Sequence, residues 1–191
     1  MTDCADTDSR RTRRITIVAH DPRWASVFRN IAHELRRIFG AQASRIDHIG
    51  STSVPELAAK PVIDIQASVP PWSSDPPWHL ALVAAGWKWD AENDERTKRF
   101  YVAPPSGPLA NLHVREAGSL TEQLALVFRD YLRTNRDAAG RYEAFKQKLA
   151  ARMWRDGDEY ADAKTEIVWP LLHEAYIWSM RSGWHPGPSD G

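Results

Sequence analysis

The sequence contains a single cysteine, Cys4, in a polar stretch near its start. One cysteine builds neither a disulfide framework within the chain nor a thiolate metal cluster, so a disulfide-stabilised domain is excluded and a reducing compartment is favoured. Residues 1–14 lack the apolar core of a signal peptide, and no apolar run approaches the roughly 20 residues that cross a bilayer. The sequence therefore predicts a soluble, cytoplasmic protein.

Net charge is also absent, because 25 basic residues balance 25 acidic ones. No overall field attracts a nucleic acid or an anionic membrane, so binding of a polyanion would need a local site. The patterns CxxC, HExxH and GxSxG and the Walker motif do not occur. Zinc-finger, metalloprotease, serine-hydrolase and P-loop interpretations therefore have no support.

The length of 191 residues suits one domain with a full hydrophobic core. Residues 1–13 are polar and lack periodicity, which predicts a disordered tail, and residues 181–191 are expected to form a flexible tail. Between them, residues 14–180 are predicted to form a single domain with a sheet part over about 14–118 and a helical part over about 119–180. The predicted fold class is α+β: a mixed sheet flanked by helices, followed by a three-helix layer.

Hydrophobic periodicity and turn residues predict the order of the elements. Strands are expected at residues 14–20 (a short edge strand), 45–49, 61–69, and twice within 97–116, where a Pro/Gly-rich loop joins a long hairpin. Helices are expected from Asp21-Pro22 to Gly40, over 54–59 behind a capping box of Ser53 and Glu56, from Asp75-Pro76 to Gly86, from Ser119 onward, from Asp137 to about Trp154, and from Glu159 to about Met180 with a kink at Pro170.

The stretch HIGSTSVPELAAKPVIDIQASV, residues 48–69, places a Gly50-Ser51 turn shortly before a strand that carries Asp64. A turn of small residues that leads into a helix exposes backbone N–H groups, which suit phosphate oxygens. Strand alternation puts Asp64 and Gln66 on one polar face, opposite the apolar face of the same strand. A carboxylate there suits Mg²⁺, which takes one or two carboxylates together with substrate phosphates. Singly, each feature is common in purely structural roles.

The combination of Gly50-Ser51, twelve intervening residues and Asp64 resembles the signature of the nucleotidyltransferase superfamily with the DNA polymerase β-like fold. More closely, HIGSTSVPELAAKPVIDIQ is similar to the hallmark of the GrpB family, an uncharacterised family of the UPF0157 type within that superfamily. The similarity continues through NLHV, LVFRDYLR, YEAFKQKLA and the pair Tyr160 and Lys164, and it spans about residues 15–178. It implies a nucleotidyltransferase-like sheet with the Gly-Ser turn and Asp64 at its site.

The resemblance also implies a metal site, with Mg²⁺ or Mn²⁺ held by Asp64 and with Asp64 and His113 as the catalytic residues. The sequence departs from the superfamily pattern at Gln66, where a second acid is usual, and at His113, where a third acid is usual. Glu116 is the only other carboxylate that this later strand offers. Three carboxylates usually hold two metal ions in such transfers. The anion-binding half of the expected site is thus complete, and its metal-binding half is reduced.

The residues expected to bind substrate phosphates are His48, Gly50, Ser51, Thr52, Ser53, Lys60, Gln66, Arg129, Lys146 and Lys164. The last three come from three different helices and would converge into a basic wall. Structural alternatives stay open for several of them. His48 suits a hydrogen-bonded structural role, Lys60 a solvated charge at a helix end, and Arg129 an ion pair with Asp130.

Two functions from different classes follow. The first is an enzyme that transfers a nucleotidyl group from a nucleoside triphosphate to an unknown small-molecule acceptor. The second, motivated by Gln66, is a catalytically inactive nucleotide-binding or regulatory module. Because some family members are fused to dephospho-CoA kinase, the resemblance links this module to coenzyme A metabolism. The expected partner is a nucleotide or another phosphate-bearing small molecule, with no membrane and no strong sign of nucleic acid, and the protein partner is unknown.

Overall fold

A computed structural model describes residues 13–72 and 75–191 of the chain. These residues form a five-stranded mixed sheet, a two-stranded sheet and six α-helices, which confirms the predicted α+β class. The disordered tail predicted for residues 1–13 lies outside the described residues except for Arg13.

The strands are β1 (Arg13–Arg14), β2 (Arg45–Ile49), β3 (Ile63–Val69), β4 (Lys88–Asp90), β5 (Lys98–Val102), β6 (Ala110–Glu116) and β7 (Met153–Trp154). The helices are α1 (Arg23–Phe39), α2 (Pro77–Ala84), α3 (Leu120–Thr134), α4 (Arg136–Ala150), α5 (Gly157–Ala163) and α6 (Thr165–Ser182), with short 3₁₀ turns η1 (Gly40–Gln42) and η2 (Ser51–Ser53).

The large sheet has the strand order β2-β3-β6-β5-β4. Only β3 and β6 pair in parallel, and the other neighbours are antiparallel. The register places Asp64 opposite Ile49 on one side and Asn111 on the other. The expected hairpin is confirmed as β5 and β6. Strand β4 was not predicted, because its three residues are mostly charged and show no strand alternation.

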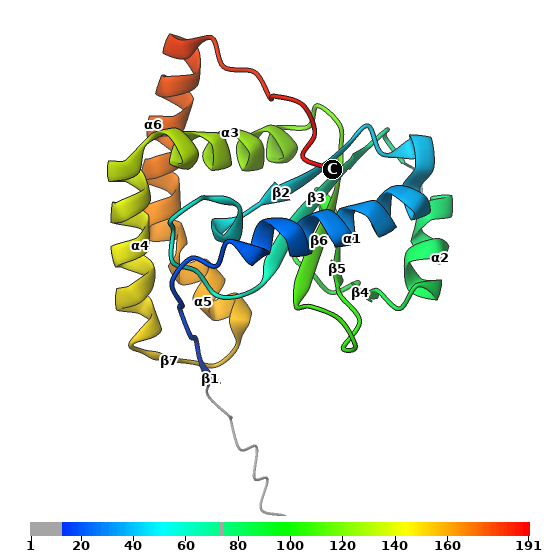
Figure 1. The fold of residues 1–191 in the computed structure, drawn as a ribbon, viewed down its shortest axis with the longest axis horizontal. Helices are drawn as coiled ribbons and strands as arrows, with labels where there is room; N and C mark the ends of the chain where they lie inside the picture. The colour runs from blue at the N-terminus through cyan, green and yellow to red at the C-terminus, as the bar shows by residue number, and fades with distance from the viewer. Residues whose placement is uncertain (1–12, 73–74) are drawn as a thin grey trace, which may run out of the picture.

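One face of the sheet carries the apolar residues of β3 and packs against α1 and α2 (Figure 1). Helix α1 suits this place because its large apolar residues recur on one side of the helix: Trp24, Phe28, Ile31 and Leu35 are buried. The core on this face contains Ile63, Ile65, Ala67, Val69, Leu112 and Val114 from the two central strands. The predicted alternation of β3 is therefore confirmed.

The C-terminal helices gather on the other side, where Figure 1 shows α4 and α6 together at the left of the sheet. A second cluster unites α3, α4 and α6 with Val54 and Leu57 from the loop after the Gly50-Ser51 turn. The helix predicted from Glu159 to Met180 is divided at Lys164, because Tyr160 packs with Trp154 in a third cluster and α6 packs in the second. Helix α6 continues through Pro170.

The edge strand predicted for residues 14–20 does not join the large sheet. Arg13 and Arg14 pair with β7, and Val18 forms an isolated bridge with Ala59. Ile15 instead contributes to the third apolar cluster with Leu149, Trp154 and Tyr160. Packing against the helical layer thus outweighs the strand propensity of this stretch.

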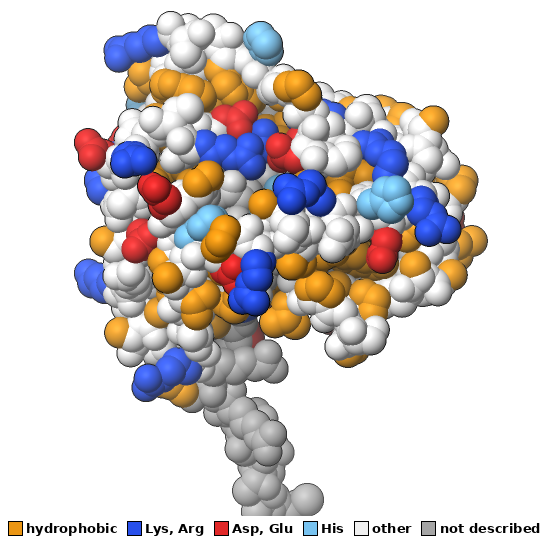
Figure 2. Space-filling view, in the orientation of Figure 1, with side chains coloured by type: hydrophobic (Ala, Val, Ile, Leu, Met, Phe, Trp, Pro, Cys, Tyr) orange, Lys and Arg blue, Asp and Glu red, His pale blue; other side chains and the backbone are white. Residues whose placement is uncertain are grey.

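Residues 187–191, for which the sequence predicts a flexible tail, lie against β2, and Figure 1 shows this last segment returning across the molecule to the sheet. A cavity of about 890 Å³ lies between α1, α2 and the loop over residues 103–108, and none of the predicted site residues lines it. Figure 2 shows basic and acidic side chains interspersed on one face. Among the described residues, no helix is both long enough and apolar enough to cross a membrane.

Candidate functional site

Strand β2 delivers the chain to Gly50, whose backbone has φ 68° and ψ −173°. This region of backbone conformation is accessible almost only to glycine. A Cβ atom at this position would lie 2.5 Å from Oδ2 of Asp64. Glycine is therefore required both by the backbone conformation and by the close contact with Asp64. Its lack of a side chain lets the turn contact the Asp64 carboxylate.

The turn continues as η2, where the amide and the hydroxyl of Ser53 both donate to the carbonyl of Gly50, at 3.2 and 2.6 Å. Within the part of the chain that the structure describes, the amides of Ser51 and Thr52 have no protein acceptor. Two adjacent N–H groups of the turn beside Asp64 thus make no hydrogen bond within the described residues. Anion binding by this turn stays a prediction.

The short helix predicted over residues 54–59 is wrong. The Ser53 hydroxyl is bound to Gly50 and does not cap a helix, and exposed Glu56 has a positive φ of 66°. The amide of Ala58 donates to Glu143 at 2.8 Å, and its carbonyl accepts from Lys146 at 2.6 Å. Helix α4 thus takes the backbone groups that a local helix would have used, and the segment stays irregular.

Asp64 is partly exposed, with 31% of its side chain accessible. Asn111 of β6 donates to Oδ1 of Asp64 at 2.9 Å, and Nε2 of His113 lies 3.7 Å from the same oxygen. Burial raises the pKa of the Asp64 carboxyl, but His113, Asn111 and the charge of Lys164 outweigh this effect, so the pKa lies below its ordinary value. Asp64 is consequently ionised at neutral pH.

His113 adjoins Asp64, as the strand alternation predicts. Burial lowers the pKa of His113 despite the neighbouring Asp64, with Arg115 and Lys98 adding to the lowering. Its Nδ1 atom is buried and has no hydrogen-bond partner among the described residues. Glu116 lies at the other end of β6, where it pairs with Val69, so it does not reach Asp64.

Gln66 is fully buried and takes no part in the open site. Its Nε2 donates to the carbonyl of Glu122 in α3 at 3.3 Å, and its Oε1 accepts from Arg115 at 3.1 Å. Arg115 in turn pairs with Glu95 at 2.9 Å. Both ends of the amide that replaces the usual second acid therefore have partners: one end bonds to α3 and the other to Arg115 of β6.

The donor set at the turn is one carboxylate, one amide and one imidazole: Asp64, Asn111 and His113. No group of three His, Cys, Asp or Glu side chains placed to hold a metal ion occurs among the described residues. A two-metal centre needs about three carboxylates, so the residues present do not fit it. One carboxylate does suit a single Mg²⁺ or Mn²⁺ that arrives with substrate phosphates.

The three predicted cations do not converge. Lys164 lies near Asp64 and Lys146, since its charge lowers the pKa of both groups, and the Lys146 amine donates to the carbonyl of Ala58. Burial, reinforced by Lys164, lowers the pKa of Lys146 to about 7. The ammonium groups lie over the rings of Tyr142 (4.6 Å) and Tyr160 (5.1 Å), respectively.

Arg129 is buried elsewhere, in a network of ion pairs at the edge of β2. Its Nε donates to Asp130 at 2.7 Å within the same helix, and its Nη1 contacts Asp47, Asp190 and the carbonyl of His48. The ion pair with Asp130, one of the alternatives from the sequence, is thus present. Arg129 is not part of a basic wall around Asp64.

His48 is buried, stacks on Phe28 at 4.8 Å and bonds through Nε2 to the Thr52 hydroxyl at 3.0 Å. The Thr52 hydroxyl donates onward to the carbonyl of Val62 at 3.1 Å. Burial and the charges of two nearby arginines lower the pKa of His48 to about 4, so the ring is neutral. These contacts place His48 and Thr52 beneath the turn. Lys60 is exposed, and its side chain makes no hydrogen bond or ion pair within the described residues.

Two residues near the turn were not singled out from the sequence. Asn111 shares the alternation that identified His113 and pairs directly with Asp64, so the strand pattern contained that signal. Arg133 donates to the carbonyl of Ser53 at 3.0 Å and so holds η2 from α3. No local pattern indicates Arg133, because its partner lies 80 residues away in the sequence.

Comparison with known proteins shows which family the chain belongs to. A family model described as GrpB protein matches residues 14–174. The chain belongs to the GrpB family. The GrpB relative UPF0157 protein BH1888 of Halalkalibacterium halodurans is 36% identical over 162 residues, which cover 84% of this chain and 82% of that protein. A dephospho-CoA kinase of Mycobacterium tuberculosis is 31% identical over 197 residues, and the match covers 89% of this chain but 48% of the kinase.

The solved structures show the same fold. The conserved protein GrpB from Enterococcus faecalis superposes with a TM-score of 0.70 and 26% identity, covering 84% of this chain and 99% of that one. A structure of the Cid1 poly(U) polymerase gives a TM-score of 0.50 and 12% identity, covering 71% of this chain and 45% of Cid1. The GrpB chain described here therefore has a nucleotidyltransferase-like fold.

Proposed function

We propose that this GrpB protein binds a nucleotide, or another phosphate-bearing small molecule, at the Gly50-Ser51 turn. The amides of Ser51 and Thr52 have no acceptor within the described residues, which makes them candidate donors to phosphate oxygens, and Gly50 lets the backbone lie close to Asp64. Lys164 supplies a positive charge near Asp64, and a phosphate bound close to Lys146 would raise the pKa of that buried lysine.

The observation that carries the proposal beyond the fold is the burial of Gln66. The position that would hold the second acid is closed over by α3 and bound at both ends of its amide. A single carboxylate does not assemble two metal ions, so a nucleotide-binding or regulatory module suits the site better than two-metal nucleotidyl transfer. Asp64 is the residue that would hold one Mg²⁺ or Mn²⁺ brought by the phosphates, and the ion would supply charge neutralisation there.

Nucleotidyl transfer with one metal ion is the second candidate. It is favoured by the lowered pKa of Asp64, which keeps the carboxylate ionised beside the free amides of the turn. The matched dephospho-CoA kinases, of which the chain spans about half, support dephospho-CoA as a ligand to test beside the four nucleoside triphosphates. A link to coenzyme A metabolism is part of this proposal.

Isothermal titration with ATP, GTP, CTP, UTP and dephospho-CoA, each with Mg²⁺, with Mn²⁺ and with a chelator, tests the binding. We expect at least one of them to bind, and we expect Asp64→Asn to remove the metal-dependent part of the affinity with little change in melting temperature. Asp75→Asn is the matched control, because that carboxylate is 80% exposed and remote in the fold from the turn. Absence of binding for every ligand in both metals would refute the proposal.

Pyrophosphate release separates the two candidates. For the binding module we expect no release above background from the wild-type protein with any triphosphate. Metal-dependent release that disappears in Asp64→Asn and persists in Asp75→Asn would favour the transferase.

A further inference from the structure

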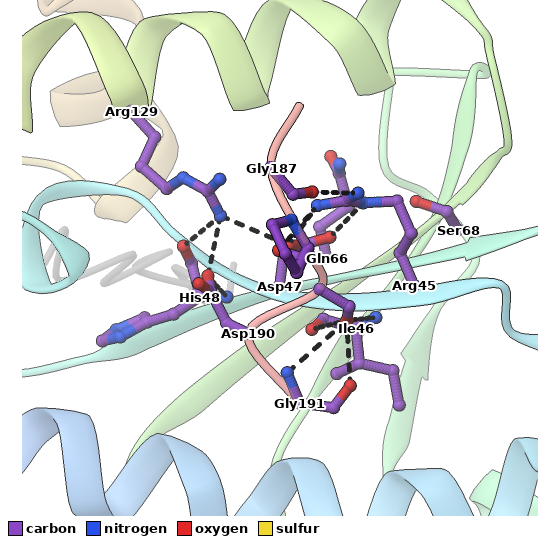
Figure 3. A network of polar contacts seen from close by, with 12 residues as sticks. Arg45, Ile46, Asp47, His48, Gln66, Ser68, Arg129, Gly187, Asp190 and Gly191 are labelled. Atoms are coloured by element: carbon purple, nitrogen blue, oxygen red, sulfur yellow. Dashed lines mark hydrogen bonds and ion pairs between the residues drawn. The ribbon is translucent and has the colours of Figure 1, made fainter. Parts of the chain in front are cut away.

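Strand β2 is one of the two edge strands of the five-stranded sheet, and β4 is the other. The outward backbone groups of an edge strand are free to pair with another segment, and proteins usually cover them. In this chain the segment over residues 187–191 lies along that edge, as Figure 3 shows. The family match ends at residue 174, so this segment is outside the part of the chain that the family model describes.

The segment and Arg129 together satisfy the four outward groups of Ile46 and His48. The amide of Ile46 donates to the Ser189 hydroxyl at 2.9 Å, and its carbonyl accepts from the amide of Gly191 at 3.0 Å. The amide of His48 donates to the Asp190 carboxylate at 3.1 Å, and its carbonyl accepts from Arg129 at 3.3 Å. Buried backbone groups need hydrogen-bond partners, so these amide and carbonyl groups favour a segment bound along the edge.

Charge complementarity adds specificity for an acidic residue. Six charged side chains meet at this edge: Arg45, Arg129, Arg133, Asp47, Asp130 and Asp190. Asp190 accepts from Arg129 at 2.7 Å and lies 3.7 Å from Arg133. Without Asp190, three guanidinium groups would face two carboxylates, and Arg129 is only 3% exposed. The edge therefore favours a carboxylate at this place.

Further contacts fix the direction of the bound segment. Arg45 donates to the carbonyl of Gly187 at 2.6 Å, and Arg36 donates to the carbonyl of Gly191 at 2.8 Å. Both use main-chain oxygens, so they recognise an extended backbone and not a particular side chain. Sequence selectivity then rests on the carboxylate of Asp190 and the hydroxyl of Ser189.

We propose that the β2 edge is a binding site for an extended peptide segment carrying an acidic residue, and that residues 187–191 fill this site intramolecularly. It follows from this proposal that an acidic peptide added in trans takes the same place once the contacts of the segment are removed. The occupied edge adjoins the Gly50-Ser51 turn, because Arg133 contacts both Asp190 and the carbonyl of Ser53. The proposal does not depend on the function proposed above.

Amide exchange measured by nuclear magnetic resonance on the full chain tests the occupancy. In the double variant Ser189→Ala/Asp190→Lys we expect the amides of Ile46 and His48 to exchange at least about tenfold faster than in the wild type, since each loses its acceptor. Glu56→Lys is the matched control, because Glu56 is 76% exposed and pairs with Arg136 on another surface. Unchanged exchange of both amides in the double variant would overturn the proposal.

Titration with the synthetic peptide Pro-Gly-Pro-Ser-Asp-Gly, residues 186–191, tests the site itself. At millimolar concentration we expect it to shift the Ile46 and His48 resonances of the double variant and not those of the wild type, where the site is filled. A peptide with Asn in place of Asp should bind at least about tenfold more weakly. Equal binding of the two peptides, or no shift in the double variant, would contradict the assignment, as would a concentration-dependent dimer of the wild-type chain that exchanges the segment between copies.

Discussion

Gly50 sets the spacing between the Gly50-Ser51 turn and Asp64. Its backbone conformation excludes other residues, and the space above its Cα is filled by the Asp64 carboxylate. The close approach brings two amides that have no acceptor among the described residues beside a carboxylate that stays ionised. One residue without a side chain thus determines the geometry of the whole candidate site.

We expect Gly50→Ala to lower the free energy of unfolding by about 3 kcal/mol, because it adds both backbone strain and a clash with Asp64. Gly118→Ala is the matched control. Gly118 also has a positive φ of 77°, but no atom lies within 4 Å of its Cβ position, so about 1 kcal/mol is expected. Urea denaturation measures both, and equal losses in the two variants would show that contact with Asp64 is unimportant.

At the scale of elements, α4 acts as a clamp on the loop that follows the turn. Glu143 and Lys146 bind the amide and the carbonyl of Ala58, and α3 adds the bond from Arg133 to Ser53. Two helices distant in sequence therefore hold the irregular segment between β2 and β3. The clamp places a buried lysine amine where its charged form is disfavoured.

This lysine makes stability depend on pH. Burial lowers the pKa of Lys146 from 10.5 to about 7, so above pH 7 the unfolded chain binds more protons than the folded chain at this group. The free-energy cost of burying the Lys146 amine is therefore greatest below pH 7, and it decreases as the pH rises toward 10.5. We expect the free energy of unfolding to rise by about 2 kcal/mol between pH 7 and pH 9 relative to Lys146→Met.

Urea denaturation at a series of pH values measures the free energy of unfolding of the wild type and of Lys146→Met. In the difference between the two proteins, the contributions of all groups that titrate in both cancel. Lys148→Met is the control, because Lys148 is exposed on the same helix and should keep the pH dependence of the wild type. Parallel curves for the wild type and Lys146→Met would show that Lys146 is not held in its neutral form.

At the scale of the whole molecule, the sheet and the helical layer share the loop that carries the site. Val54 and Leu57, which follow the turn, belong to the same apolar cluster as Leu171 of α6. Loss of the helical layer would remove the packing that supports the turn. We therefore predict that residues 14–180 unfold as one unit.

Leu171 is fully buried, and we expect Leu171→Ala to lower the free energy of unfolding by about 3 kcal/mol. Leu80→Ala should change it little, because Leu80 is 70% exposed. Tryptophan fluorescence and far-ultraviolet circular dichroism should report coincident transitions in both variants. A separate early transition in Leu171→Ala would indicate two independently folding parts and contradict the single-domain prediction.

Local sequence determined the elements whose partners are close or whose pattern is strong. The apolar spacing of α1, the alternation of β3 and the hairpin of β5 and β6 were all predicted, because each depends on a periodicity that one segment carries by itself. The same alternation placed Asp64 beside His113, and the resemblance of residues 48–69 to the GrpB family identified the fold.

Only the tertiary structure decided which polar groups were free to act. Gln66 and Asp64 share one face of β3, yet α3 covers Gln66 and leaves Asp64 open. Lys146 and Arg129 are both helix cations by sequence, and their partners separate them into two sites. Each of these outcomes depends on contacts between residues more than 50 positions apart, and hydrophobic periodicity contains no information about such pairings.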